Sequence, residues 1–387
     1  MKTVTLSRTS RINAGHLWVF SNELMESPKA FEPGTIVELH DKKGAFLGIG
    51  YINPHSLISV RILTRENEEI NEGFFKKRIL AAIEYRRRFT SDTNAYRAVY
   101  SESDLLPGLI VDMYAGCASI QISTLGMEKW TDVIIKAVEE TLAPDTIVLR
   151  NDSQIRLLEG LAMEKRLVKG SLEKLPVIKH GSTLMEIDPM AGQKTGFFLD
   201  QADNRSAFAA LVSTGRALDL FCYAGGWALK LAEKGASVTG VDSSELAVAQ
   251  AAKNAAMNGL SEKCAFIKDD VFEFLKKAVA SGDLYDYIVL DPPAFVKSKQ
   301  KLAEALRAYK EVNTAAMKVL KKGGLIATST CSYHVDLATF MDILRDAARN
   351  AGRHARLIEM RSQSKDHPIS LSVPETYYLK CAILEVD

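Results

Sequence analysis

A cysteine and a carboxylate end two strand-like runs in the C-terminal half of the chain. Cys331 lies near the end of the apolar run 325–332, and Asp291 ends the run 285–291 and begins the sequence Asp-Pro-Pro-Ala-Phe. Ligands of an open α/β sheet bind outside the carboxyl ends of its strands, so we expect both groups at a ligand site. A thiolate can attack an electrophilic carbon and a carboxylate can share a proton, so the pair indicates covalent chemistry. The alternative is that Cys331 is a small buried residue, which is a common place for a free cysteine.

Acidic residues also end three strand-like runs earlier in this region. Asp219 precedes a glycine-containing turn, Asp242 ends the second run, and Asp269 with Asp270 ends the third. The Gly-x-Gly-x-x-Gly spacing with which a dinucleotide fold holds a pyrophosphate is absent from the turn. Asp219 would instead attract an ammonium or sulfonium group, Asp242 could accept both hydrogen bonds of a ribose diol, and Asp269-Asp270 could meet the exocyclic amine of adenine. Together these acids predict a site for S-adenosylmethionine, although Asp270 also suits the N-cap of the following helix.

Strand-like and helix-like runs alternate regularly from about residue 190. The strand candidates are residues 216–221, 237–242, 265–269, 285–291 and 325–332, and the helix candidates are residues 226–234, 244–257, 271–280, 302–320 and 335–350. Apolar strands that alternate with helices predict an α/β fold with a parallel, doubly wound sheet. Residues 356–360 and 377–384 could add two closing strands.

The N-terminal part of the chain has a different pattern. Residues 34–39, 46–52 and 57–63 read as short strands broken by turns, which predicts a small β-barrel. Residues 72–89 read as an amphipathic helix, and strand candidates at 108–112, 118–122 and 146–150 with a helix at 130–142 follow it without strict alternation. We therefore expect three domains: a barrel at 1–70, a central α/β domain at 71–185, and the alternating domain at 186–387.

Composition sets wider limits on the class of protein. The 387 residues are 47% apolar and 25% charged with a formal net charge of +1, which is typical of a globular protein and does not indicate a polyanion partner. Basic residues still cluster locally, at Lys2, Arg8 and Arg11, at 86–88, and at Lys297, Lys299 and Lys301. The run 86–88 is most simply a solvated helix face. The basic residues before residue 20 predict a barrel face that contacts phosphates.

The five cysteines are odd in number and lack metal-ligand spacing. This pattern predicts a reduced, cytoplasmic protein without a metal. The first residues contain no apolar signal-peptide core, and no apolar run approaches the ~20 residues that span a membrane. We therefore expect neither secretion nor membrane insertion.

Several longer motifs connect these features to a known family. They are residues 15–21, 101–112 (Ser-Glu-Ser-Asp-Leu-Leu-Pro-Gly-Leu-Ile-Val-Asp), 194–205 (Lys-Thr-Gly-Phe-Phe-Leu-Asp-Gln-Ala-Asp-Asn-Arg), 291–295 and 330–332. With them the chain resembles class I S-adenosylmethionine-dependent methyltransferases and, more narrowly, the ribosomal RNA large-subunit cytosine-5 methyltransferase I family. The resemblance extends over essentially the whole chain, and the second and third motifs are the most specific.

The resemblance implies an N-terminal PUA barrel that helps to bind RNA, a central α/β domain and a C-terminal Rossmann-like methyltransferase domain. It implies large-subunit ribosomal RNA as substrate and places residues 194–205 beside the cofactor. The strand ends and the resemblance together predict these cofactor contacts: Thr195, Phe198, Asp200, Arg205, Asp219, Cys222, Tyr223, Gly225, Asp242, Ser243, Asp269, Asp270 and Pro292. A structural alternative is that Phe198 belongs to a core and that Asp200 and Arg205 form a local ion pair.

Cytosine C5 is too weak a nucleophile to take a methyl group directly, so the ring must first be activated. We expect the Cys331 thiolate to add to C6, after which C5 takes the methyl group and loss of the C5 proton expels the thiol. Asp291 would share a proton with N3, and Phe295 would pack near the flipped base. Ala294 and Phe295 stand where another group of RNA cytosine-5 methyltransferases has a second cysteine, so the base that removes the C5 proton is unassigned; Lys297 is close in sequence but weakly supported.

Three other functions compete with this hypothesis. The first is methylation of an exocyclic amine, such as guanine N2, with Cys331 incidental. The second is an RNA-binding or assembly protein that has lost catalysis, against which the acids at 219, 242 and 291 argue. A nicotinamide-dependent oxidoreductase ranks last because the glycine spacing is missing. The sequence leaves open the modified nucleotide, the choice between free RNA and an assembling subunit, and the choice between monomer and homodimer.

Overall fold

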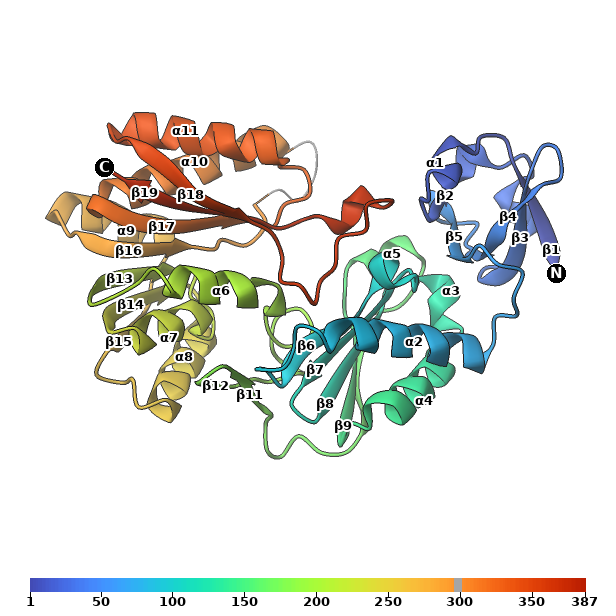
Figure 1. Ribbon diagram of the computed structural model, residues 1–387, viewed down its shortest axis with the longest axis horizontal. Helices are drawn as coiled ribbons and strands as arrows, with labels where there is room; N and C mark the ends of the chain where they lie inside the picture. The colour runs from blue at the N-terminus through green and yellow to red at the C-terminus, as the bar shows by residue number, and fades with distance from the viewer. Residues whose placement is uncertain (296–300) are drawn as a thin grey trace. The chain divides into compact units, whose positions relative to one another are not determined.

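The computed structural model describes residues 1–295 and 301–387, which form two compact units (Figure 1). The first unit contains Met1–Lys179, Ile187–Leu199 and Lys365–Thr376, and the second contains His180–Glu186, Asp200–Ser364 and Tyr377–Asp387. Lys297 and Lys299 lie outside the described residues. Within those residues, every helix is too short or too polar to cross a membrane.

A five-stranded sheet opens the first unit. Its strands lie in the order β1-β3-β4-β5-β2, with β1 parallel to β3 and the other pairs antiparallel. The elements are β1 (Lys2–Leu6), α1 (Ser10–Asn13), β2 (Trp18–Phe20), β3 (Thr35–Asp41), β4 (Phe46–Ile52) and β5 (Ile58–Thr64). Alternate residues such as Val4 and Leu6, or Val37 and Leu39, are buried together, as expected for strands with one face on a core. The three predicted strands are confirmed, and β1 and β2 complete the sheet.

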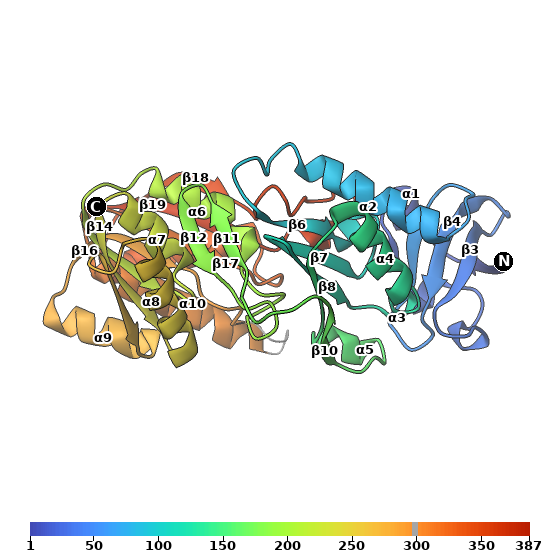
Figure 2. The same cartoon turned by 90° about the horizontal axis from the view of Figure 1, so that it is seen from below.

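A second five-stranded sheet forms the rest of the first unit, in the order β10-β9-β8-β7-β6. The elements are α2 (Glu72–Arg86), β6 (Ala95–Tyr100), β7 (Leu109–Tyr114), β8 (Cys117–Ile122), α3 (Leu125–Glu128), α4 (Thr131–Leu142), β9 (Thr146–Asn151), α5 (Ile155–Leu158) and β10 (Glu164–Lys169). Asn71 caps α2 by accepting a hydrogen bond from the Phe74 amide at 3.1 Å. Helices α2 and α4 pack beside each other and bury Phe75 and Ile134 with the apolar residues of β7 and β8 (Figure 2).

The prediction of a solvated helix face at residues 86–88 was wrong for Arg86. Its side chain is buried; it pairs with Asp104 at 2.6 Å and donates to the carbonyl oxygens of Arg97 and Asp366 at 2.8 and 2.9 Å. Arg87 is 66% exposed, as predicted. The segment Lys365–Thr376, far away in sequence, covers the end of α2 and provides acceptors for Arg86, which helical periodicity could not reveal.

A buried ion pair in the central sheet holds the segment Ile187–Leu199. Arg97 on β6 makes two 2.8 Å hydrogen bonds to the two carboxylate oxygens of Asp112 on β7. Asp112 also accepts a hydrogen bond from the hydroxyl of Thr195, which lies 3.0 Å from the hydroxyl of Tyr114. The sequence motif that contains Thr195 is therefore tied to the sheet by polar contacts that exclude water.

The second unit is built on a seven-stranded sheet in the order β15-β14-β13-β16-β17-β19-β18. Its strands are β13 (Gly215–Leu220), β14 (Ala236–Asp242), β15 (Cys264–Lys268), β16 (Tyr285–Leu290), β17 (Leu320–Thr330), β18 (Ala355–Arg361) and β19 (Lys380–Val386). Its helices are α6 (Ala202–Ala209), α7 (Gly226–Glu233), α8 (Glu245–Met257), α9 (Val271–Ser281), α10 (Leu302–Lys318) and α11 (Leu337–Ala351). A hairpin of β11 (Val177–His180) and β12 (Thr183–Glu186) precedes it in the chain.

The helices cover both faces of this sheet, with α6, α7 and α8 on one side and α9, α10 and α11 on the other (Figure 1). The first five strands of the order are parallel, and β19 runs antiparallel between β17 and β18. The predicted doubly wound parallel sheet is thus confirmed. Strand order reverses between β13 and β16, and such a switch point is where open α/β sheets bind ligands.

Replacing Asp112 by Ala should destabilise the central sheet, because it leaves the Arg97 guanidinium buried without its counter-ion. Breaking a buried ion pair on one side costs about 3–5 kcal/mol. Hydrogen exchange of the β6 and β7 amides, read by mass spectrometry, measures this local free energy of opening. Glu84→Ala is the control, because it removes an exposed partner of Arg87 and should change the free energy by less than about 1 kcal/mol. Unchanged protection in Asp112→Ala would contradict the role assigned to the pair.

Candidate active site

The carboxylate of Asp291 is held from two sides at the switch point. Asp291 follows β16 directly, and its Oδ1 accepts a 2.8 Å hydrogen bond from Nε2 of Gln201, which immediately precedes α6. Its Oδ2 accepts a 3.1 Å hydrogen bond from Nε1 of Trp227, in the first turn of α7. Both oxygens therefore have a fixed direction at the strand end.

Cys331 lies at the end of the neighbouring strand. Strands β16 and β17 pair in parallel with Leu290 opposite Thr328, so Asp291 lies near Ser329. Nε2 of Gln201 bridges the two strands, because it also donates to the Ser329 hydroxyl at 3.1 Å. Cys331 follows two residues later, on the same side of an extended chain as Ser329, and it is partly exposed. The structure therefore places the predicted carboxylate and thiol at adjacent strand ends.

Asp219, the penultimate residue of β13, is fully buried at the same edge of the sheet. Its Oδ2 accepts a 2.9 Å hydrogen bond from the Ala228 amide, and its Oδ1 has no partner in the part of the chain that the structure describes. Burial, together with the nearby charges of Asp291 and Asp242, raises the pKa of Asp219 well above its usual range. A buried oxygen without a partner is costly, so the position favours a ligand that donates hydrogen bonds or carries positive charge.

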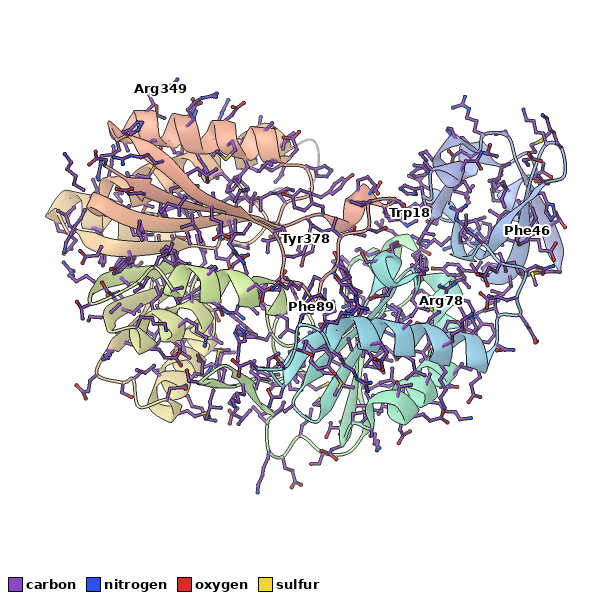
Figure 3. The ribbon with its side chains drawn as sticks, in the orientation of Figure 1. Trp18, Phe46, Arg78, Phe89, Arg349 and Tyr378 are labelled. Carbon is purple, nitrogen blue, oxygen red and sulfur yellow. The ribbon has the colours of Figure 1, made fainter. Side chains whose placement is uncertain are left out.

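Arg205 is the buried cation among these acids. Burial lowers the pKa of Arg205 to about 10, although the charges of Asp200, Asp291 and Asp219 oppose the decrease. Asp200 in turn accepts a 2.5 Å hydrogen bond from the hydroxyl of Tyr378. Tyr378 is labelled in Figure 3. Asp203 is a fourth carboxylate that acts electrostatically on this guanidinium, so the acids outnumber the cation even when Asp219 is protonated. This excess of acids suits the ammonium and sulfonium groups of S-adenosylmethionine.

The turn between β13 and α7 is unusually tight. Phe221, Tyr223 and Gly225 have φ values of 64°, 46° and 84°, a left-handed region that costs energy for the two residues with side chains. The Tyr223 amide donates to Oδ2 of Asp242 at 3.0 Å, and the Ser244 amide donates to Oδ1 at 2.9 Å. Two backbone amides thus orient the Asp242 carboxylate, and lone pairs on both oxygens can still accept ribose hydroxyls.

Close packing explains why glycine occupies position 225. A Cβ there would lie 3.2 Å from the Ala251 Cβ and 3.3 Å from the Phe266 ring.

The predicted contact Ser243, next to Asp242, is exposed, and Pro292, next to Asp291, is buried.

Burial keeps the other four thiols protonated. It raises the pKa of Cys222 far above the usual value for a thiol, and it raises the pKa of Cys117 and Cys381 to about 12 and that of Cys264 to about 11. Only thiolates are effective nucleophiles, so none of these four residues is suited to the attacking role. Cys222 lies in the tight turn and fits its predicted place beside the cofactor better than a catalytic one.

Asp269 and Asp270 already have partners within the protein. Asp270 is the N-cap of α9, where its Oδ1 accepts from the amides of Phe272 and Glu273 at 2.9 and 3.2 Å. Asp269 lies 2.7 Å from Nζ of Lys277, and this hydrogen bond lowers the pKa of Asp269. The structure accounts for Asp270 as a helix cap, and the predicted contact of the pair with adenine stays a prediction.

The remaining predicted residues divide between the two units. Thr195 and Phe198 belong to the first unit, where Nζ of Lys194 lies 4.5 Å from the centre of the Phe198 ring. Phe295, expected near the target base, packs against Phe221, Phe272 and Tyr309, with ring centres 6.2, 6.1 and 4.7 Å away.

Four residues of this site were not identified from the sequence: Gln201, Trp227, Tyr378 and Lys380. Gln201 lies inside the motif 194–205 and Trp227 follows the glycine turn, so their places in the sequence already indicated residues close to the cofactor site. Lys380 is the single cation of a strand whose other residues, apart from Glu385, are apolar, and its burial distinguishes it from the other lysines of the sheet.

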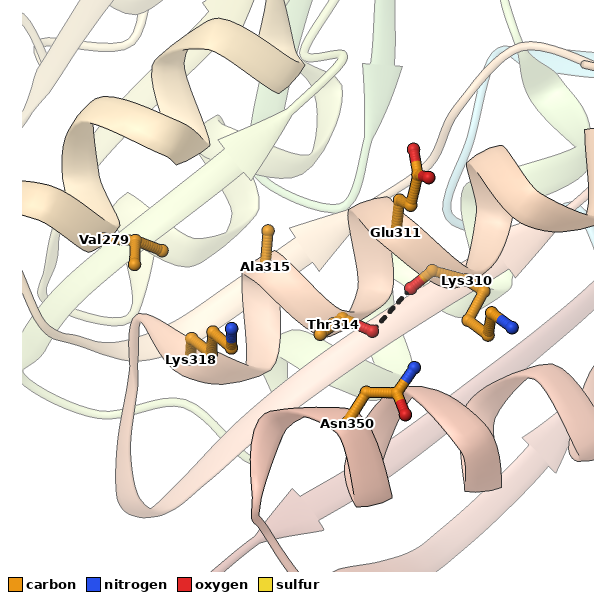
Figure 4. Close-up of a pocket in the computed structure, with 7 residues that line it drawn as sticks. All are labelled: Val279, Lys310, Glu311, Thr314, Ala315, Lys318 and Asn350. Carbon is orange, nitrogen blue, oxygen red and sulfur yellow. Dashed lines mark hydrogen bonds between the residues drawn. The ribbon is translucent and has the colours of Figure 1, made fainter.

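A separate pocket of about 310 Å³ lies on helices α9, α10 and α11 (Figure 4). It is lined by Val279, Lys310, Glu311, Thr314, Ala315, Lys318 and Asn350. None of the predicted site residues lines it, so we do not assign it to the active site.

Comparison with known proteins identifies both ends of the chain. Residues 3–65 match the family described as a PUA-like domain, and residues 211–370 match the family described as a methyltransferase domain. A solved structure described as a methyltransferase complexed with SAH has a TM-score of 0.87 at 19% identity, and one of a SAM-dependent methyltransferase from Streptococcus mutans has a TM-score of 0.85 at 19% identity. Each likeness covers all of both chains, and it confirms the predicted fold.

Relatives of higher identity match over nearly the full length. The chain is 36% identical to a protein of Pseudoalteromonas atlantica over 376 aligned residues. The alignment covers 96% of this chain and 95% of the relative. The chain is also 37% identical over 389 residues to a protein of Shewanella denitrificans, which covers 98% and 97%. Both relatives are named ribosomal RNA large subunit methyltransferase I. The predicted methyltransferase with S-adenosylmethionine as cofactor is thereby confirmed, and the chain belongs to the ribosomal RNA large subunit methyltransferase I family.

Proposed function

We propose that the protein transfers a methyl group from S-adenosylmethionine to C5 of a cytosine in large-subunit ribosomal RNA, through a covalent bond between Cys331 and C6. The names of the relatives support the RNA substrate. The observation that carries the chemistry is the pair at the switch point: the partly exposed thiol of Cys331 beside a carboxylate held by Gln201 and Trp227. The other four thiols are kept protonated by burial.

In this reaction Cys331 supplies the nucleophile, the bound donor supplies the methyl group, and the base that removes the C5 proton is unassigned. The Cys331 thiolate forms a bond to C6, and the electron pair of the C5–C6 double bond becomes available at C5. C5 takes the methyl group, S-adenosylhomocysteine leaves, and a base removes the C5 proton as the C6–S bond breaks and the thiolate departs. Asp291 holds a proton at N3 while negative charge develops on the ring, and the hydrogen bonds from Gln201 and Trp227 keep it in one direction.

The cofactor is placed by the acids at the other strand ends. Asp219 faces its positive charge, because one buried carboxylate oxygen lacks a protein partner within the described part of the chain. Asp242 holds the ribose hydroxyls, because backbone amides already orient its carboxylate. The excess of buried carboxylates around Arg205 supports this placement of the positively charged cofactor.

RNA contacts the N-terminal sheet in this proposal. Lys2 and Arg8 are exposed, whereas Arg11 donates to the Trp18 carbonyl oxygen at 2.6 Å and lies 3.5 Å from Glu23. Lys2 and Arg8 are therefore better placed for phosphates than Arg11, which is already used within the sheet.

Replacing Cys331 by Ala should abolish methyl transfer, with a loss of at least about 1,000-fold in kcat, because the ring can no longer be activated. Transfer of a labelled methyl group to ribosomal RNA measures this loss. Cys264→Ala is the matched control, since it removes another partly exposed thiol and should leave transfer unchanged. RNA with 5-fluorocytosine should trap a covalent complex with the native protein, because the adduct cannot lose a C5 proton. Retained transfer in Cys331→Ala would favour methylation of an exocyclic amine instead.

Binding of S-adenosylmethionine should release a proton from Asp219. The pKa of Asp219 is raised in the free protein, and a bound cation lowers it, so the complex holds fewer protons and affinity increases with pH. The increase should extend up to the raised pKa of Asp219 in the free protein. Calorimetry in two buffers of different ionisation enthalpy counts the proton. Asp219→Asn should bind more weakly and release none, and proton release that persists in Asp219→Asn would exclude this assignment.

Replacing Lys2 and Arg8 together by Ala should weaken RNA binding and flatten its salt dependence. Loss of two phosphate contacts should reduce the slope of log K against log salt by about 1.4 to 1.8. Filter binding at several salt concentrations measures the slope. Lys276→Ala, which removes an exposed charge on α9, should leave it unchanged. An unaltered slope in the double variant would exclude this face as the RNA contact.

A further inference from the structure

Lys380 lies directly beside the nucleophile of the proposed reaction. It is the first residue of β19 and pairs with Thr330, the last residue of β17. Cys331 directly follows Thr330 in the chain, so Lys380 lies across from the residue that precedes the nucleophile. Its side chain is 2% exposed, and Nζ lies 3.5 Å from the carbonyl oxygen of Ser332 and 3.3 Å from that of Tyr378. The ammonium is therefore held against the residue that follows Cys331.

This buried cation lacks a carboxylate partner. Among the described residues, no carboxylate oxygen lies within 4.0 Å of Nζ of Lys380, and its hydrogen-bond acceptors are the two carbonyl oxygens. The other buried residues of β19 are apolar or, at Cys381, a protonated thiol. A buried ammonium is costly unless a negative charge compensates it. An anion that forms at Cys331 would provide that compensation.

Tyr309 and Asp336 also interact with Cys331 or Lys380, and neither is a cation, whereas Arg361 on β18 interacts with the neighbouring Cys381. Tyr309 on α10 interacts electrostatically with both Cys331 and Asp291, and burial raises the pKa of Tyr309 to about 12, so it stays neutral. Asp336, the N-cap of α11, interacts with Lys380 and carries negative charge. The ring of Tyr377 lies 5.1 Å from Nζ of Lys380. Asp291 and Asp336 both disfavour a thiolate, so a compensating positive charge is needed for one to form.

We propose that the Lys380 ammonium stabilises the thiolate of Cys331 and thereby prepares it for attack on the base. The thiol proton leaves to water, Lys380 stays protonated, and the anion forms next to an existing cation. Lys380 acts through Cys331 and is a positioning residue. The role of Lys380 in catalysis rests on the proposed function, because a thiolate matters only if Cys331 is the nucleophile. Thiolate formation itself can be measured without RNA or cofactor. Burial lowers the pKa of Lys380, and the charges of Asp336 and Cys331 oppose this decrease. A negative charge at Cys331 therefore stabilises the protonated form of Lys380.

Alkylation by iodoacetamide tests the thiolate in the full-length protein. The rate of carbamidomethylation of the peptide that contains Cys331, followed by mass spectrometry from pH 5.5 to 10, gives a profile whose midpoint reports thiolate formation. In Lys380→Met the midpoint should shift upward by about one pH unit or more, which is roughly a tenfold lower rate at neutral pH. Lys380→Arg keeps the charge and should restore most of the native profile. Lys322→Met removes an 82% exposed lysine from the other end of β17 and should leave the midpoint in place.

A second variant keeps the test decisive if Lys380→Met does not fold. Asp336→Asn keeps the helix cap, since Asn is as good an N-cap as Asp, and it removes an anion that opposes the thiolate. Its midpoint should shift downward, and a circular dichroism spectrum and melting temperature like those of the native protein separate this shift from unfolding. An unchanged midpoint in folded Lys380→Met, an equal shift in Lys322→Met, or no downward shift in Asp336→Asn would overturn the proposal.

The two proposals fail in different ways. If the midpoints shift as expected but Cys331→Ala still transfers methyl groups, the covalent function is wrong and the role of Lys380 toward the thiol stands. If Cys331→Ala is inactive but Lys380→Met has the native midpoint, the function stands and this inference is wrong.

Discussion

The active site depends on how one carboxylate is held at the switch point of the second unit. Asp291 accepts hydrogen bonds from Gln201 and Trp227, which come from the starts of two helices on the same side of the sheet. Gln201 also contacts Ser329, so the same side chain sets the relation between the ends of β16 and β17. With the carboxylate fixed in this way, the thiol at Cys331 and the acid at Asp219 have defined places around it. In the proposed reaction, a mobile carboxylate could not hold a proton at N3 while C6, on the opposite side of the ring, is attacked.

Burial then decides which groups around that carboxylate carry charge. It raises the pKa of Asp219 and of four cysteines, and it lowers the pKa of Arg205 and Lys380. The fifth cysteine, Cys331, is partly exposed and has a lysine beside it. Cys264 is also partly exposed, so what distinguishes Cys331 is its place at the end of β17 beside Asp291 and Lys380. Burial also explains why a cationic methyl donor suits the site, since the buried acids outnumber the guanidinium that interacts with them.

Much of the second unit could be predicted because its signals are local. The apolar runs of β13, β14 and β16 and the helices between them predict the observed ends within two residues, whereas β17 begins at Leu320, five residues before the predicted run. The first unit was harder. Strand β2 has only three residues, and β6 and β10 lie at the edges of their sheet, where alternation of apolar and polar residues is weak. Arg86 was misjudged because its acceptors come from Asp104 and Asp366, and the second lies 280 positions away in sequence.

The sequence by itself determined the alternation of strands and helices, the acids at the strand ends and the presence of a thiol near the end of β17, because each is a property of a few adjacent residues. Only the tertiary structure decided what surrounds them. Gln201 and Asp291 are 90 positions apart, Trp227 and Asp291 are 64 apart, and Lys380 lies 48 positions after Ser332. The insertion of β19 between β17 and β18 brings that lysine to the thiol, and strand order is set by how whole elements pack, which no local pattern encodes.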